Sequence, residues 1–162
     1  MIAQRLVRRL CQYCKKKTEI SQEKKEKIGI FLNNLPKRVD KTKYKEIEIF
    51  EPLAGGCEKC NNAGYKGRVG IYELLLNDPD YEKFLINQER TNLSSHKKLE
   101  ELILSSASDS QIKEFAMEQG ATIMQQDGVL KVIQGITTFE EVEAVTGTIA
   151  WRNRKYKVVS ET

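Results

Sequence analysis

All four cysteines of this chain fall into two C-x-x-C pairs, Cys11 with Cys14 and Cys57 with Cys60, and 42 residues separate the pairs. A C-x-x-C turn aims both sulfurs at one point, so two such turns brought together form the tetrahedral thiolate cage that Zn²⁺ prefers. The gap is longer than the roughly 15–20 residues of a simple zinc ribbon, which predicts an excursion between the pairs. Four thiolates close the coordination shell, so we expect a structural metal site rather than a catalytic one.

Other interpretations of the cysteines stay open. Two disulfides need an oxidising compartment, and the first residues lack the apolar region and cleavage site of a signal peptide. A redox C-x-x-C normally opens a helix of a thioredoxin-like βαβ unit, a pattern that this sequence does not show. Unligated buried thiols rarely occur as two matched pairs. The single histidine, His96, excludes a multi-histidine metal site.

Positive charge is concentrated around the cysteines. Residues 1–60 contain 15 Lys and Arg and 8 Asp and Glu, whereas the whole chain of 162 residues has a net charge of +4. A Zn(Cys)₄ centre carries a formal charge of −2, which Arg9, Lys15 and Lys59 would compensate. The alternative is a nucleic-acid-binding surface in the basic stretch 15–45. Acidic residues interrupt this stretch, and few aromatic residues lie within it to stack on bases, so we favour local compensation.

The hydrophobic pattern predicts an α+β fold in three parts. Residues 1–76 would form a small zinc-stapled subdomain of short strands and helices, residues 77–147 a C-terminal helical bundle, and residues 148–162 a strand-like or disordered tail. Apolar and polar residues alternate over 45–50, which predicts a strand, and residues 69–75 are the second candidate strand. The four-residue spacing of Ile2, Leu6 and Leu10 predicts the end of a helix over 2–10.

Capping residues predict the remaining helices. Ser21 would cap a helix that ends near Leu32. Further helices are expected over 78–87, from Ser94, after Ser108 and over 122–134. A capping box begun by Thr138 would start a short helix that ends near Gly147.

Glycines cluster around the second cysteine pair. Gly56 would let the chain turn tightly into the metal site, and Gly64 and Gly67 would permit a positive φ in the loop that leads to the second strand. Gly70 lies within that strand. Arg68 would contact a helix C-terminus or a group of carbonyls, or remain a solvated loop charge.

Two classes of function are excluded by missing motifs. No glycine is followed by lysine, so the chain has no P-loop, and we do not expect it to hydrolyse a nucleotide through one. No apolar run approaches the roughly 18–20 residues of a membrane span.

Three segments carry a resemblance to a known family. They read AQRLVRRLCxxC over 3–14, GCxxCNxxGYxGRxGIYE over 56–73 and GATIMQQDGVLKVIQGITTFEEV over 120–142. Together they resemble the C-terminal region of the secretion-traffic ATPases, the cytoplasmic hexameric motors of type II secretion and type IV pilus assembly. The resemblance covers nearly the whole chain, to about Gly147. Residues 80–98 look inserted, and Thr122 or Ile123 stands where the family commonly has a basic residue.

The resemblance implies a function that the spacing alone does not. The tetracysteine element of such motors binds zinc and projects from a RecA-like core, and ATP and Mg²⁺ bind only in that core. This chain would then be a non-catalytic C-terminal part of a protein-transport motor, with residue 1 marking a cut after the core. Its partners would be the motor core, neighbouring subunits and an inner-membrane platform protein. It would be cytoplasmic and peripheral to the membrane, without membrane insertion or nucleic-acid binding.

Overall fold

The computed structural model describes residues 2–36, 39–44, 47–74, 101–118, 121–149 and 151. Their elements, in chain order, are β1 (Ile2–Leu10), β2 (Lys16–Thr18), α1 (Gln22–Asn33), η1 (Lys41–Tyr44), β3 (Ile49–Glu51), η2 (Glu58–Cys60), β4 (Tyr65–Leu74), α4 (Asp109–Glu118), α5 (Met124–Ile133) and α6 (Phe139–Thr146). The mixture of helix and strand confirms the predicted α+β class.

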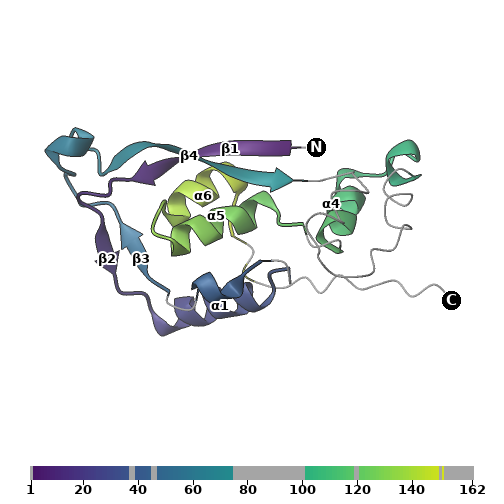
Figure 1. Ribbon diagram of the computed structural model, residues 1–162, viewed down its shortest axis with the longest axis horizontal. Coiled ribbons are helices and arrows are strands. Elements are labelled where there is room, and N and C mark those ends of the chain that lie inside the picture. The colour runs from purple at the N-terminus through teal and green to yellow at the C-terminus, as the bar shows by residue number, and fades with distance from the viewer. Residues whose placement is uncertain are drawn as a thin grey trace.

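Two small antiparallel sheets organise these elements. β1 pairs with β4 from Ile2 opposite Leu74 to Leu10 opposite Tyr65, with an irregularity between Arg8 and Leu10, and β2 pairs with β3. In Figure 1 the β1–β4 ribbon forms one layer, α5 and α6 lie beneath it, and α1 lies on the opposite side of these helices.

The helix predicted over residues 2–10 is wrong, because these residues form strand β1. A four-residue spacing places side chains on one face of a helix, but it also places them on one face of a strand, whose period is two. Ile2 and Leu6 are 74% and 51% exposed, whereas Val7, on the other face, is buried at 2%. Pairing with β4 therefore decides the conformation.

The predicted helix starts agree with the structure where it describes them. The Ser21 side chain accepts a hydrogen bond from the Lys24 N–H, and Thr138 accepts one from the Glu141 N–H. α4 follows Ser108, and α5 begins two residues later than predicted. The strands predicted over 45–50 and 69–75 correspond to β3 and β4, which have shifted bounds.

Several predictions fall outside the described residues. These are the helix over 78–87, the helix start at Ser94, the insertion over 80–98, His96 and the boundary between residues 76 and 77. The C-terminal helical bundle and the division into domains therefore remain predictions.

One hydrophobic core joins the first part of the chain to the last helices. Its buried members come from α1, β3, α5, α6 and the segments that follow α1 and α6: Ile28, Phe31, Leu35, Ile49, Val129, Leu130, Val132, Ile133, Phe139, Val142 and Ile149. The Trp151 ring meets Phe139 and Phe31 edge to face, with centroids 5.4 and 6.4 Å away. The start of the predicted tail thus packs between α1 and α6.

Carboxylates on α5 and α6 attach the ribbon to these helices. Glu141 of α6 accepts hydrogen bonds from the Arg8 backbone N–H (2.9 Å) and from its guanidinium (2.6 and 2.9 Å), which also lies 4.2 Å from the centre of the Tyr65 ring. Asp127 of α5 accepts a hydrogen bond from the Tyr72 backbone N–H at 2.9 Å and also pairs with Lys131. Each strand of the ribbon is therefore bonded to one helix. No helix within the described part of the chain is long and apolar enough to cross a membrane.

Helices α5 and α6 cross closely at Gly128. A Cβ at this position would lie 2.7 Å from Val142 Cγ1, whereas a Cβ at Gly29 in α1 would meet nothing within 4 Å. We expect Gly128→Ala to lower the free energy of unfolding by about 1–2 kcal/mol, because overpacking outweighs the gain in helix propensity. Gly29→Ala should raise it by about 0.5–1 kcal/mol. Denaturant unfolding of both variants tests this difference in sign, and equal effects would contradict it.

The Arg8–Glu141 pair predicts a pH-dependent contribution to stability. Hydrogen bonding to Arg8 lowers the pKa of the Glu141 carboxyl, although burial opposes this shift. A lowered folded-state pKa stabilises the fold above the unfolded value of about 4.3 and ceases to do so as the pH falls through the folded value. Glu141→Gln should cost about 1 kcal/mol at pH 7, with the difference from wild type shrinking below about pH 4.

The neighbouring residue provides the control for this measurement. Glu140 is exposed on the same turn of α6. Glu140→Gln should leave the unfolding free energy nearly unchanged across the same pH range. If both variants behaved alike, the Arg8–Glu141 pair would not be responsible for the pH dependence.

Candidate metal centre

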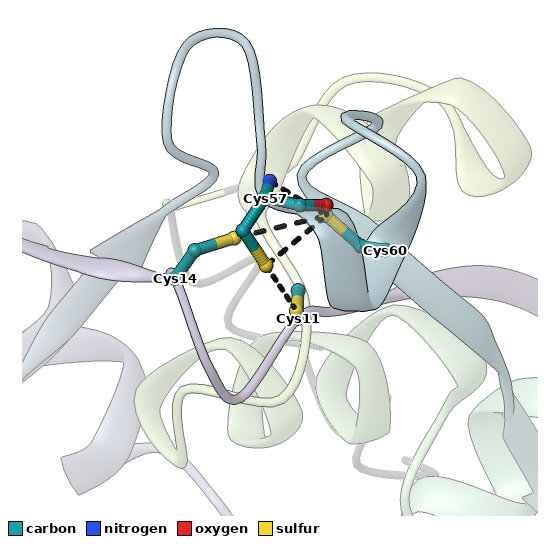
Figure 2. Close-up of side chains that lie close together, drawn as sticks. All are labelled: Cys11, Cys14, Cys57 and Cys60. Atoms are coloured by element: carbon teal, nitrogen blue, oxygen red, sulfur yellow. Dashed lines mark hydrogen bonds between the residues drawn. The ribbon is translucent and has the colours of Figure 1, made fainter.

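The four cysteine sulfurs converge at one end of the β1–β4 ribbon. The Sγ atoms of Cys57 and Cys60 are 3.7 Å apart, those of Cys14 and Cys60 are 3.8 Å apart, and those of Cys11 and Cys57 are 3.9 Å apart. All four lie within 4.8 Å of one another. Figure 2 shows the side chains from both C-x-x-C turns directed into this cluster.

These distances fit a tetrahedral metal site. Four sulfurs at the usual Zn–S distance of about 2.3 Å would be separated by about 3.8 Å along each edge of the tetrahedron. A disulfide would bring two sulfurs to about 2.05 Å, and all four cysteines are free thiols. The donor set is all sulfur, which favours Zn²⁺ or another thiophilic ion over Mg²⁺ or Ca²⁺. The residues present therefore fit the predicted metal.

Backbone hydrogen bonds shape both turns. In the first, the N–H groups of Cys14 and Lys15 donate to the Cys11 carbonyl, at 3.3 and 2.9 Å. In the second, η2 begins at Glu58, and the Cys60 N–H donates to the Cys57 carbonyl at 3.0 Å. The Cys11 N–H donates to the Gly64 carbonyl at 3.0 Å, which ties the first turn to the loop that follows the second. Ribbon pairing and this bond together bring the two cysteine pairs into contact.

The loop around the second pair depends on glycine. Gly56, Gly64 and Gly67 have φ of +57°, +73° and +76°, so the positive φ expected at Gly64 and Gly67 is present. A Cβ at Gly56 would lie 2.4 Å from the Asn62 carbonyl carbon. Gly70 lies in β4 beneath the Tyr72 ring.

The loop also contains left-handed residues that the sequence analysis missed. Asn61 and Asn62 have φ of 51° and 61°. Asparagine is among the few residues that tolerate this region, so the pair of asparagines after Cys60 is the sequence signal that could have identified the turn.

The pKa values of the Cys14 and Cys60 thiols shift in opposite directions. Burial, together with hydrogen bonds to the other cysteines, raises the pKa of the Cys14 thiol to about 12. Burial would also raise the pKa of the Cys60 thiol, but the N–H groups of Cys57 and Gly64 donate to its sulfur at 3.2 and 3.3 Å and bring the pKa down to about 6. The hydrogen bonds to Cys60 thus favour its thiolate, and a bound divalent cation would stabilise thiolates at the site.

The predicted compensating cations occupy different surroundings. The Lys15 ammonium donates to the Gly135 carbonyl at 2.8 Å and lies 4.3 Å from the centre of the Phe50 ring, so it contacts the end of α5 as well as neighbouring the cysteines. Arg9 and Lys59 are exposed. Charge compensation by these three residues remains a prediction.

The alternative functions find less support in the described residues. In the basic stretch 15–45, lysines pair with acidic side chains, as in Lys27 with Glu23 and Lys17 with Glu48. Tyr13 is 73% exposed, but Phe31 belongs to the core and Tyr44 packs against it. For a dithiol oxidoreductase, the described strands form two antiparallel pairs rather than a parallel βαβ unit.

The chain is similar to proteins of secretion and pilus machinery. Residues 1–98 match the family described as type II/IV secretion system protein. The chain is 34% identical to the type IV pilus assembly ATPase PilB of Pseudomonas aeruginosa and 31% identical to that of Thermus thermophilus, over 90% of its length in each case and 20% and 13% of theirs. It is 36% identical to the type II secretion system ATPase E of Vibrio cholerae, over 90% of this chain and 23% of that protein.

These matches show the family of the chain and how much of each relative it covers. The chain spans about a fifth of the length of most of these relatives. The family match includes β1, both cysteine pairs and β4, the elements that form and surround the sulfur cluster. This chain belongs to the type II/IV secretion system protein family.

Proposed function

We propose that this chain is a non-catalytic C-terminal portion of a cytoplasmic hexameric ATPase that powers type II secretion or type IV pilus assembly. The observation that carries the proposal is the cluster of four sulfurs at the spacing of a zinc tetrahedron, in a chain whose relatives are named as secretion and pilus ATPases. The sequence contains no P-loop, so ATP and Mg²⁺ would bind in another part of the whole protein.

In this proposal the metal is structural. Cys11, Cys14, Cys57 and Cys60 would hold Zn²⁺, which would supply four strong bonds and leave no open coordination position. The N–H groups that donate to Cys60 would hold that ligand in place. The site would thereby fix the end of the β1–β4 ribbon.

The ribbon offers a surface for partners within such an assembly. Ile2 and Leu74 are opposite one another, and Leu6 and Tyr72 follow on the same face at even spacing. All four side chains are at least 40% exposed. An exposed apolar face supports contact with the motor core, a neighbouring subunit or a platform protein. A location at the cytoplasmic side of the inner membrane belongs to the same proposal.

Metal content and metal removal test the structural site. We expect about one zinc per chain by elemental analysis, and a large fall in melting temperature after chelation, because the binding free energy of a structural zinc contributes to folding. Cys57→Ser should lose the metal and loosen the first half of the chain. Gln12→Ser, which alters an exposed residue between Cys11 and Cys14, should keep both. A metal-free protein of unchanged thermal stability would refute the site.

A chimaera tests the motor assignment. In the PilB of Pseudomonas aeruginosa, the matching segment would be replaced by this chain, and assembled pili would be counted by electron microscopy. We expect the chimaera and its Gln12→Ser form to assemble pili, and the Cys57→Ser form to assemble at least tenfold fewer. A soluble chimaera without pili, or a Cys57→Ser form as active as its parent, would count against the proposal.

A further inference from the structure

We propose that the metal site controls the docking of helices α5 and α6 through a clasp between the first cysteine turn and the loop at residues 134–138. We use the name clasp for the hydrogen bonds that join this loop to residues 8–15. The inference rests on the structural zinc proposed above and goes beyond it, because it assigns the metal an effect on helices that supply no ligand.

The clasp consists of bonds on both sides of Cys11. Before it, the Thr137 hydroxyl donates to the Arg8 carbonyl, and the Leu10 N–H donates to the Ile136 carbonyl, both at 2.8 Å. After Cys14, the Lys15 ammonium donates to the Gly135 carbonyl, also at 2.8 Å. The partners run in opposite directions along the two segments, so the loop lies antiparallel to the segment that contains the first cysteine turn, with bonds before and after that turn. A displacement of this turn would strain every one of these bonds.

Buried hydroxyls disfavour states in which only some of the hydrogen bonds of the clasp are broken. Thr137 and Thr138 are 0% and 2% exposed, and among the described residues they are the buried polar side chains. The Thr138 hydroxyl also lies 3.4 Å from the Tyr65 hydroxyl of β4. A buried hydroxyl without a partner costs about 1–3 kcal/mol, so a partly detached loop is disfavoured. We therefore expect the bonds between the loop and the ribbon to break in one step, in which the threonine hydroxyls become exposed to water.

Close packing leaves the loop little room to adjust. Gly135 has a φ of +66°, and a Cβ there would lie 2.6 Å from the Phe50 ring and 3.1 Å from Lys15 Nζ. Phe50 belongs to β3, which pairs with β2 directly after the first cysteine turn. Gly135 is thus enclosed by Lys15, which follows the first cysteine turn, and by Phe50, whose strand pairs with β2.

Metal loss would act through this geometry. Without the ion, the first turn keeps its backbone bond to Gly64 but loses the metal–sulfur bonds that join it to the second turn, so residues 11–15 gain freedom. The residues that bond to the loop at 134–138 are then no longer held in place, so the loop that joins α5 to α6 is less firmly bound to the ribbon. The competing view is that the metal staples only the two cysteine turns, while the hydrophobic core holds α5 and α6 unaided.

Hydrogen exchange distinguishes the two views in the whole chain. Backbone amides would be followed by NMR with Zn²⁺ bound and after chelation. The clasp predicts at least tenfold faster exchange in the metal-free protein at the amides of Leu10 and Ile136 and in the first turn of α6, with a smaller change in α1. Unchanged protection at residues 134–142, in a protein shown to have bound and released one zinc, would overturn the clasp.

Reciprocity supplies a second test. If the metal stabilises the clasp, breaking the clasp weakens metal binding by the same factor. Thr137→Val removes one hydrogen bond without changing the side-chain shape, and we expect Zn²⁺ affinity, measured against a competing chelator, to fall about three- to tenfold. Thr146→Val is the matched control, because that hydroxyl donates to the Val142 carbonyl at 2.8 Å and accepts from the Gln125 side chain at 3.4 Å, and neither bond reaches residues 8–15. It should leave the affinity unchanged within about twofold.

The outcomes separate the clasp from the site itself. If the wild-type chain binds no zinc, the proposed structural site is wrong. The clasp is wrong, and the structural site is supported, if the wild-type chain binds zinc but two further results hold. Thr137→Val and Thr146→Val would have equal zinc affinities, and amide exchange at residues 134–142 would be the same with and without the metal. If Thr137→Val fails to fold, the exchange measurement on the wild-type chain decides.

Discussion

Antiparallel pairing of β1 with β4 is the constraint on which the rest of this structure depends. The two strands lie far apart in the sequence, and each is next to one cysteine pair: β1 ends at Leu10, just before Cys11, and β4 begins at Tyr65, shortly after Cys60. Once the strands pair in this register, the two C-x-x-C turns must meet at the same end. The sulfur cluster is therefore a consequence of strand register as well as of cysteine spacing.

The ribbon and the core are held by different forces. Apolar burial joins α1, β3, α5 and α6, with Trp151 closing the gap between α1 and α6. The ribbon buries fewer large side chains, chiefly Val7, Leu10 and Ile71, and is joined to α5 and α6 by carboxylates and by the loop at residues 134–138. A small ribbon with so little apolar surface would gain most from the metal proposed at its end. The four cysteines accordingly lie at the end of the ribbon rather than on the helices.

Local chemistry explains what could be predicted from the sequence. Ser21 and Thr138 form caps with partners three residues away, and the four cysteines lie in two self-contained turns, so each signal is complete within a few residues. Strand β1 was mistaken for a helix because the spacing of Ile2, Leu6 and Leu10 fits both periods, and only the distant strand β4 decides between them. The role of Lys15 as a counter-charge for the thiolates remains a prediction, whereas its bond to Gly135 could not be predicted, because it depends on a loop 120 residues away.

The carboxylates of Glu141 and Asp127 have a consequence for solubility as well as for docking. An exposed strand edge presents backbone N–H groups that can recruit a strand from another molecule and start aggregation. Glu141 occupies the N–H of Arg8 on β1, and Asp127 occupies that of Tyr72 on β4. An incoming strand would have to displace a charged group at each place, and its own carbonyls would meet negative charge. The same two side chains that seat the ribbon on its helices thus also make it a poor template for intermolecular β-sheet.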